Sequence, residues 1–301
     1  MAGVARGDVG LAMKSRDTSF YYSFLVLPPD KRNAIVAVWG FCRAVDDAVD
    51  EIAPDSVRGD GLPEEVRQQA AASLAAWRQE LAAVYEGRPS TPQGIALQPF
   101  VGRFNLPRAQ FEALIDGVEM DLSLHRYPDF DTLLQYCHRV ASSVGLICVE
   151  IFGYQDPRSR DYAVSLGVAL QLTNIVRDVA VDLKKGRVYL PTEDMAWFHV
   201  REDDLRAGVV TAHISQLLRY QCRRARQFYQ QASANLPATD ARSLVAARIM
   251  GAIYFGILER IEQARYDVFS QVIRVPRWRR ALLALQLWAG SMLLAPTWRR
   301  V

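Results

Sequence analysis

The chain has 301 residues, of which 50% are hydrophobic, and its 36 basic and 33 acidic side chains give a formal net charge of +3. This small charge, with no Lys/Arg block beside a suitable motif, argues against a nucleic-acid-binding protein. Four cysteines without CxxC spacing indicate neither a zinc site nor a disulfide framework, and we expect them to be reduced core residues of a cytoplasmic protein.

Apolar residues recur every three or four positions along most of the chain, and strand patterns are almost absent. Proline- and glycine-rich breaks divide this pattern into segments. The first predicted helix begins at "LPPDKR", ends at about residue 52 and is followed by the loop "APDSVRGDGLP". Further helices are predicted at 64–85, 92–104, 107–122, 129–152, 157–184, 192–197, 201–206, 211–235, 239–269 and 276–294. Without repeats or linkers, we predict one all-α domain over residues 1–301.

No segment of the sequence predicts a membrane span or a signal peptide. The first twenty residues lack a continuous apolar stretch, and no run reaches 18 uncharged apolar residues. The segment "RWRRALLALQLWAGSMLLAPTWRR" comes nearest, because arginines bracket its short apolar run. The pattern favours a last helix packed on the core, and the alternative is a basic amphipathic helix in peripheral contact with a membrane.

The segment "GFCRAVDDAVDE" (40–51) places charge inside an apolar helical pattern. Asp46 and Asp50 are four residues apart and share one helix face, and Arg43 lies one turn before Asp46. Taken alone, this segment is explained equally well by ordinary charge on a solvated helix face.

A second acidic segment, "QLTNIVRDVAVD" (171–182), places Asn174, Asp178 and Asp182 in one helical stripe. Like charges at i,i+4 repel each other, so surface patterning explains this stripe less well. A cation between the side chains would remove the repulsion. Carboxylate and amide oxygens without nearby His or Cys select hard cations, which predicts Mg²⁺ bridging phosphate oxygens.

Basic residues accompany both acidic stripes, and they are Arg43, Arg177, Lys184, Lys185 and Arg187. A diphosphate needs this mixture of divalent metal and Arg or Lys donors, although the two lysines also fit a solvated helix end. The glycine-rich motifs of nucleotide sites are missing, which disfavours ATP. Metal-assisted departure of diphosphate from an allylic carbon leaves a carbocation that an apolar cavity inside a helical bundle can shield from water.

Two longer segments, "YCHRVASSVG" (136–145) and "LGVALQLTNIVRDVAVDLKKGRVYLP" (166–191), resemble the signature segments of the squalene/phytoene synthase family, which joins two prenyl diphosphates head to head. The residues at family spacing in the second segment are Gly167, Gln171, Asn174, Arg177, Asp178, Asp182, Arg187, Tyr189 and Pro191. Within the family, "SFYYSF", "FCRAVDDAVDE" and "EIFGYQDP" are most similar to bacterial presqualene diphosphate synthases of hopanoid biosynthesis. The resemblance implies an all-α isoprenoid synthase bundle with a central apolar cavity.

The resemblance also implies roles for individual residues. The ligands of two or three Mg²⁺ ions would be Asp46, Asp50, Asn174, Asp178 and Asp182. Arg43 and Arg177 would act on the departing diphosphate, which Arg187 also contacts, and Tyr136 would lie near the reacting carbons. The remaining substrate-binding residues would be Ser19, Phe20, Tyr22, Gln171, Tyr189 and Tyr254. Without the surrounding signature, Tyr136 would read as an ordinary aromatic residue on a helix face.

The sequence departs from the family pattern in two places. Ala180 and Val181 replace the usual Gly-Glu, but the flanking aspartates remain, so we expect activity to be retained. Gln271 stands where relatives often carry a basic residue, and Arg274, nearly one turn on, is a candidate substitute.

The sequence therefore predicts a Mg²⁺-dependent prenyltransferase that condenses two farnesyl diphosphates to presqualene diphosphate without NADPH. The alternatives are a phytoene synthase that uses geranylgeranyl diphosphate and a squalene synthase that continues with NADPH. An alternative of another class is a catalytically silent assembly or scaffold relative, which degraded acidic stripes would mark, whereas both stripes are intact here. A generic metal-binding bundle does not account for Arg177, Arg187 and Tyr189 at their spacing.

Overall fold

The computed structural model describes residues 21–50 and 63–293, and within these ranges the chain forms helices and no strand. The helices are α2 (Tyr21–Leu25), α3 (Pro29–Asp50), α4 (Glu64–Tyr85), α5 (Pro92–Val101), α6 (Arg108–Ser123), α7 (Phe130–Cys137), the π-helix η1 (His138–Ser142), α8 (Ser143–Phe152), α9 (Arg158–Arg177), α10 (Val179–Lys184), α11 (Thr192–Trp197), α12 (Glu202–Arg206), α13 (Ala212–Asn235), α14 (Val245–Gln263) and α15 (Arg277–Leu293). The predicted all-α fold class is confirmed.

Several helices begin where a polar side chain caps them. Thr91, Asp129 and Thr211 each accept a hydrogen bond from a backbone N–H three residues further on, at the starts of α5, α7 and α13. Such caps satisfy a backbone donor that has no partner inside the helix. These starts lie within a residue of the predicted ones, because capping is a local property of the sequence.

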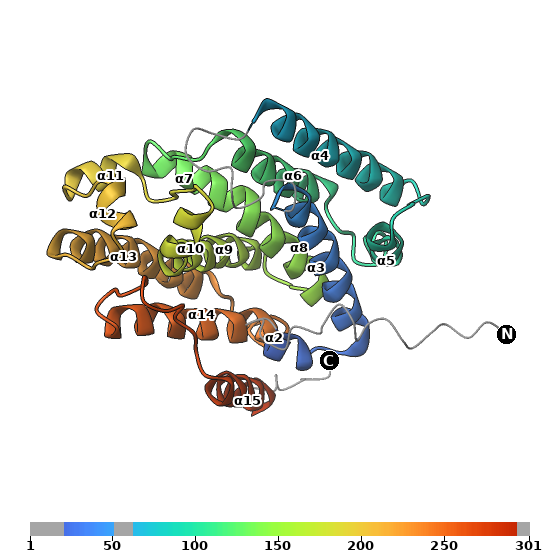
Figure 1. The fold of residues 1–301 in the computed structure, drawn as a ribbon. Coiled ribbons are helices and arrows are strands. Elements are labelled where there is room, and N and C mark those ends of the chain that lie inside the picture. Colours follow the sequence, from blue (N-terminus) through green and yellow to red (C-terminus); the bar gives the residue numbers. More distant parts are fainter. Residues whose placement is uncertain (1–20, 51–62, 294–301) are drawn as a thin grey trace.

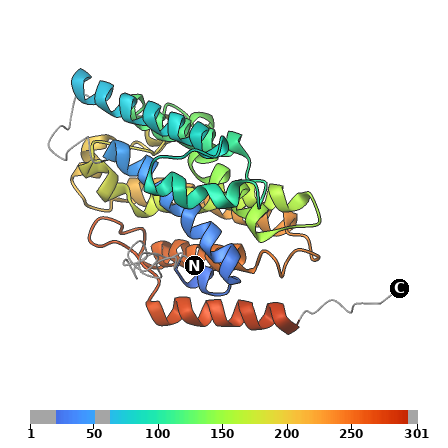
Figure 2. The same ribbon diagram turned by 90° about the vertical axis from the view of Figure 1, so that its right-hand side faces the viewer.

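Helix α9 lies at the centre of the bundle and packs against η1, α8, α13 and α14 (Figure 1). Apolar and small residues cover nearly its whole circumference, which is typical of a helix buried on all sides. On one side, α3 and α6 pack against α4, and α5 packs against α3 and α4. On the opposite side, α14 packs against α15, which forms the lower edge of the molecule (Figures 1 and 2).

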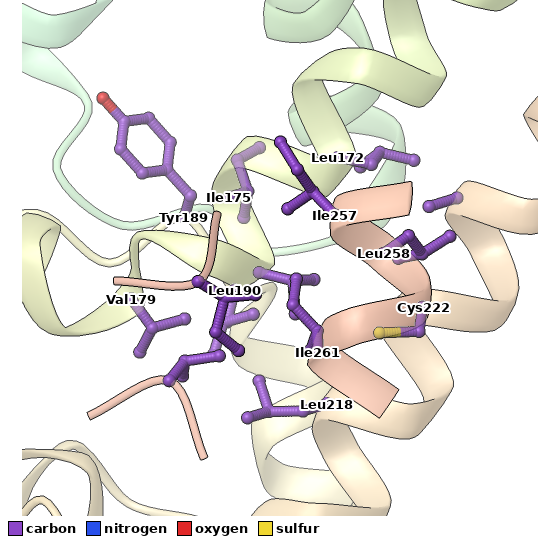
Figure 3. Close-up of a cluster of buried hydrophobic side chains, with 14 of the residues drawn as sticks. Leu172, Ile175, Val179, Tyr189, Leu190, Leu218, Cys222, Ile257, Leu258 and Ile261 are labelled. Carbon is purple, nitrogen blue, oxygen red and sulfur yellow. The ribbon is translucent and has the colours of Figure 1, made fainter. Parts of the chain in front are cut away.

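Two clusters of buried hydrophobic side chains meet at α9. One contains residues of α9, α13 and α14, and Figure 3 shows Leu172 and Ile175 of α9 beside Ile257 of α14. The other joins α3, α4, α6 and α8 to the first half of α9. Because α9 contributes to both clusters, its polar residues are held rigidly between them.

Two glycines let α9 approach the preceding helices at backbone distance. A Cβ atom at Gly167 would lie 2.8 Å from the Cα atom of Ser142 in η1. A Cβ atom at Gly145 of α8 would lie 2.8 Å from the carbonyl oxygen of Ala163 in α9. Any larger side chain at these positions would push the helices apart, so the close packing depends on glycine.

Two predicted helices are interrupted in the structure. The predicted helix 129–152 contains the π-helical turn η1, and the predicted helix 157–184 is divided between α9 and α10. At Asp178 the backbone leaves the helical conformation (φ −101°, ψ 10°), and its carboxylate pairs with the side chain of Arg177. Aspartate favours such non-helical positions because its side chain bonds to nearby groups. Asn174, Asp178 and Asp182 therefore do not lie on one straight helix, contrary to the prediction.

The predicted helix 239–269 is too long at both ends. The carboxylate of Asp240 accepts hydrogen bonds from the backbone N–H groups of Gln155 and Asp156, so this segment forms a turn and α14 begins only at Val245. At the other end, Arg265 takes a left-handed backbone conformation (φ 53°), which no α-helix continues through. Predicted position 52 of the first helix lies outside the described residues.

No helix in the described ranges is long and apolar enough to cross a bilayer, in agreement with the sequence. The last helix of the described ranges, α15, lies along the outside of the bundle (Figure 2).

Candidate active site

A cavity of about 620 Å³ lies between α3, α6, α8, α9 and α14. The α9 residues in its wall follow one helix face, namely Tyr162, Ala163, Leu166, Gly167, Leu170, Gln171 and Asn174. The α3 residues in its wall are Ile35, Val38, Trp39, Cys42, Arg43, Asp46 and Asp47. On both helices the lining begins apolar and ends polar. At about 1.5 Å of rise per residue, the α9 wall extends about 18 Å.

The two helices start at the same end of this cavity. Near the start of α3, the Nζ atom of Lys31 donates a hydrogen bond of 2.5 Å to the carbonyl oxygen of Phe152, at the end of α8. Helix α9 begins directly after the short loop that follows Phe152. The cavity therefore has one apolar end, beside Ile35 and Tyr162, and one polar end, beside Asp46 and Asn174.

The first acidic pair lies at the polar end. Asp46 is exposed and lines the cavity, and its neighbour Asp47 accepts a hydrogen bond of 3.3 Å from Arg43. Arg43 also lines the cavity and lies over the Trp39 ring. Asp50 belongs to the last turn of α3, but its side chain lies outside the described residues.

The second acidic group surrounds the end of α9. Asn174 lines the cavity, and its buried Oδ1 atom has no hydrogen-bond partner among the described residues. Asp178 follows between α9 and α10, and Asp182 lies on α10. Burial and the nearby Asp178 carboxylate raise the pKa of Asp182 to about 7, because both effects disfavour the charged form. A buried oxygen without a hydrogen-bond donor and two carboxylates that repel each other are features expected of a binding site for a hard cation.

The described residues contain no group of three His, Cys, Asp or Glu side chains that is close enough to hold a metal. The oxygen donors nevertheless fit Mg²⁺, since they are carboxylates and one amide without imidazole or thiolate. Asp46 of α3 and Asn174 of α9 line the polar end of the cavity, whereas Asp178 and Asp182 follow Asn174 in the chain and do not line it. The candidate metal ligands therefore come from two segments that are distant in the sequence, α3 and the region where α9 ends and α10 begins.

Arg177 is held in a fixed position beside this site. Its Nε atom donates a hydrogen bond of 2.8 Å to Asp178, and its side chain is mostly buried. Arg177 and Asn174 also hydrogen-bond to the hydroxyl of Tyr254 on α14. Burial raises the pKa of Tyr254, and these two hydrogen bonds offset part of that increase. The structure thus brings four predicted residues together, and Gln171, one turn before, lines the same cavity.

Tyr136 and Tyr189 share one acceptor, the buried carboxyl group of Asp121 on α6. The hydroxyl of Tyr136 donates to Oδ2 at 3.2 Å, and that of Tyr189 donates to Oδ1 at 2.9 Å. The two rings stack with centroids 5.2 Å apart, and Tyr127 stacks on Tyr189 at 5.5 Å. Burial, reinforced by Asp121, raises the pKa of both Tyr136 and Tyr189, so both hydroxyls keep their protons at neutral pH.

Asp121 is a residue that the sequence reasoning missed. A signal was present, because Asp121 falls on the same face of the predicted helix 107–122 as the apolar residues Leu114 and Val118. An acidic residue on a buried helix face needs partners. Nothing in the sequence identified those partners as Tyr136 and Tyr189, which come from two other segments.

Arg187 and Tyr189 lie together with Asp182 but do not line the large cavity. They line a small void next to α10 instead. Of the two tyrosines that contact Asp121, Tyr136 lines the large cavity and Tyr189 does not.

Three predicted substrate-binding residues are not placed. Ser19 and Phe20 lie outside the described residues, and the backbone of Tyr22 belongs to α2 while its side chain is not described. Phe24, on the same short helix, lines the cavity. Gln271 and Arg274 line a separate pocket of about 340 Å³ and do not line the large cavity.

Comparisons of the whole sequence with known proteins agree on one protein family. The family model described as squalene/phytoene synthase matches residues 13–279. A phytoene synthase from Arthrospira platensis is 36% identical over 279 residues, which cover 88% of this chain and 86% of that protein. A presqualene diphosphate synthase from Rhodopseudomonas palustris is 37% identical over 251 residues, which cover 83% and 84%.

Solved structures show the same fold. A dehydrosqualene synthase crystallised with a ligand superposes with a TM-score of 0.78 at 26% identity, covering 95% of this chain and 97% of that chain. A squalene synthase from Alicyclobacillus acidocaldarius superposes with a TM-score of 0.72 at 26% identity, covering 86% and 93%.

Proposed function

The chain belongs to the squalene/phytoene synthase family, and on this premise we propose that it joins two molecules of farnesyl diphosphate head to head to give presqualene diphosphate. The observation that carries the proposal is a cavity whose polar end holds Asp46, Asn174 and Arg43 and whose walls are otherwise mostly apolar. Such a cavity can hold a charged diphosphate and its hydrocarbon chain at the same time. The presqualene diphosphate synthase at 37% identity supports the choice of product.

Mg²⁺ would be held by Asp46, Asp50, Asn174, Asp178 and Asp182. When bound, the metal neutralises the charge of the diphosphate and assists its departure. The unpartnered Oδ1 atom of Asn174 and the raised pKa of Asp182 support this assignment, because a divalent cation would relieve both.

The residues of the chain itself have distinct tasks in this proposal. Arg177, oriented by Asp178 and Tyr254, binds diphosphate oxygens from the α9 side, and Arg43 does so from the α3 side. The allylic C–O bond breaks, and the diphosphate leaves with the electron pair. The double bond of the second substrate then forms the new C–C bond, and loss of a proton closes the cyclopropane. The apolar walls exclude the water that would otherwise capture the cation.

Tyr136 acts next to the reacting carbons. Tyr136 lines the cavity, and its hydroxyl, which donates to Asp121 and lies 3.3 Å from the hydroxyl of Tyr189, would stabilise positive charge at this wall. Asp121 would act through Tyr136 as a positioning residue.

The test is a product assay with Mg²⁺ and labelled farnesyl diphosphate, with and without NADPH, and with geranylgeranyl diphosphate in parallel. We expect presqualene diphosphate in both farnesyl reactions. An Asn174→Ala variant provides the matched control, since the loss of one oxygen donor should reduce turnover strongly while the fold is retained. Squalene formed only with NADPH would instead identify a squalene synthase. No product from either substrate, with a folded protein, would favour the scaffold alternative.

A second candidate is phytoene formation from geranylgeranyl diphosphate. It is supported by similarity to phytoene synthases at 36% identity over most of both chains. Turnover of the longer substrate alone in the same assay would establish this candidate and overturn the first.

A further inference from the structure

Helix α15 exposes a continuous apolar stripe to solvent. The stripe consists of Trp278, Leu282, Leu285, Trp288 and Met292. Their spacing of three or four residues places them within about a third of the helix circumference. Trp278 is 64% exposed and Leu285 is 58% exposed, so these side chains contribute little to the packing of the chain.

The opposite face of α15 packs against the hydrophobic core. Ala284 is buried in the cluster formed with α14, and Leu283 and Leu287 pack against that cluster. The helix contacts α14 and α2. Because the inner face is sufficient to attach α15 to the bundle, the outer stripe is not needed for that attachment. A helix that is apolar on both faces and lies at the edge of a molecule needs a second apolar medium.

The charge of α15 indicates which medium this is. The helix contains three arginines, Arg277, Arg279 and Arg280, and no acidic residue. All three lie in its first turn, where the positive end of the helix dipole disfavours cations, so helix stability does not explain them. Arg277 and Arg279 are exposed on either side of Trp278, and the Arg279 guanidinium lies over the Trp278 ring. Exposed arginines around a tryptophan match the headgroup region of an anionic membrane.

The position of the stripe relates it to the cavity. Helices α14 and α2, on which α15 packs, also form part of the cavity wall through Met250, Tyr254 and Phe24. One layer of helices therefore separates the cavity from the exposed stripe. Leu25 of α2 is exposed as well.

We propose that α15 binds this protein to the surface of an anionic phospholipid bilayer, with the apolar stripe buried among the acyl chains and the exposed Arg277 and Arg279 at the phosphate groups. The helix lies in the plane of the membrane and does not cross it. With α15 between them, the side of the cavity formed by α14 and α2 then lies close to the phase that dissolves prenyl chains.

The test is flotation of the full chain with vesicles of phosphatidylcholine, with or without phosphatidylglycerol, in the absence of substrate. We expect binding to the anionic vesicles that weakens as salt is added. Trp278→Ala combined with Leu285→Gln should weaken binding at least about tenfold. Arg279→Gln should weaken binding to anionic vesicles by about fivefold, the effect of one basic residue near such a surface.

The matched control is Trp197→Ala. Trp197 is 80% exposed on α11, at a distance from α15 (Figure 1), and its replacement should leave vesicle binding unchanged. Brominated lipids provide a measurement without any variant, because they should quench the tryptophan fluorescence of the wild-type chain. The proposal is overturned if the chain does not bind anionic vesicles, or if the double variant binds as the wild type does. It is also overturned if the stripe instead holds two copies of the chain together, which sedimentation would reveal as a dimer that the double variant dissociates.

Discussion

Asp121 joins two tyrosines that are far apart in the sequence, because Tyr136 and Tyr189 both donate to its carboxyl group. Tyr127 belongs to the same aromatic stack, but its buried hydroxyl has no hydrogen-bond partner among the described residues. The three hydroxyl groups therefore contribute differently to the stability of the fold. A buried hydroxyl that is bonded stabilises the fold, and a buried hydroxyl without a partner destabilises it.

We predict that Tyr189→Phe lowers the free energy of unfolding by about 1–3 kcal/mol, because it removes a hydrogen bond to a buried carboxyl group. Tyr127→Phe should be neutral or stabilising, since it removes a buried hydroxyl that has no partner. Urea unfolding of the two variants, which differ from the wild type by one oxygen atom each, measures the difference. Equal losses of stability would contradict the inferred inequality.

Asp182 should make the metal-free protein pH-sensitive. Burial, together with the nearby Asp178 carboxylate, raises the pKa of Asp182 in the folded state to about 7 from its ordinary value of 3.8. Between these two values the folded chain retains a proton that the unfolded chain has released, so the free energy of unfolding should fall as the pH rises. Below the unfolded-state pKa, the stabilising contribution of Asp182 is fully present, and above its folded-state pKa this contribution is lost.

In EDTA, we expect Asp182→Asn to unfold at a higher temperature than the wild type at pH 8 and at a similar temperature at pH 4. Thermal melts across this range provide the measurement. Addition of Mg²⁺ at pH 8 should raise the wild-type melting temperature and have less effect on the variant. Parallel pH profiles for the two proteins would show that Asp182 is not the responsible group.

At the scale of elements, the contact between α9 and η1 determines where the polar residues of α9 lie. Gly167 makes this contact, and a methyl group there would meet the backbone of Ser142. The π-helical turn lies on the other side of the contact, between Tyr136 and the cavity-lining residue Val144. A π-turn shifts the register of the residues that follow it, so Tyr136 and α8 line the same cavity.

Gly167→Ala should lower the free energy of unfolding by about 1–3 kcal/mol, the cost of overpacking a close helix contact. Gly40→Ala is the matched control, since a Cβ atom at Gly40 in α3 would meet nothing within 4 Å. The control should stabilise α3 by about 1 kcal/mol through helix propensity. Denaturant unfolding of both variants measures the two effects, and stabilisation by Gly167→Ala would refute the close contact.

At the scale of the whole molecule, the cavity separates charge from hydrocarbon along the length of α9. Asn174 marks the polar end, and Tyr162 with Phe152 closes the apolar end. Both aromatic residues are buried. The length of prenyl chain that fits should therefore depend on the aromatic end, which lies far from the diphosphate.

We predict that Tyr162→Ala increases the use of geranylgeranyl diphosphate relative to farnesyl diphosphate by about tenfold, the discrimination that a few methylene groups in an apolar pocket give. Competition between the two substrates measures this ratio. Phe111→Ala is the control, because Phe111 is as deeply buried but does not line the cavity. It should lower stability without changing the ratio, and an equal change in both variants would exclude Tyr162 as the end of the cavity.

Local properties of the sequence determined much of this molecule. Apolar periodicity and the proline- and glycine-rich breaks predicted the all-α class and most helix bounds, including α4 at 64–85 and α11 at 192–197. The i,i+4 spacing of polar residues identified Asp46 and Asn174, which the structure places at one end of the cavity. These predictions succeed because helix formation and helix faces depend on residues close together in the chain.

Only the tertiary structure decided how those faces meet. It separated Arg187 and Tyr189 from the large cavity, paired Tyr136 with Asp121, and placed Tyr162 at the apolar end. It also divided the predicted helix 157–184 at Asp178, where a side-chain pairing competes with the helix. These outcomes depend on contacts between segments distant in the sequence, and such contacts result from the packing of whole helices, which no local pattern records.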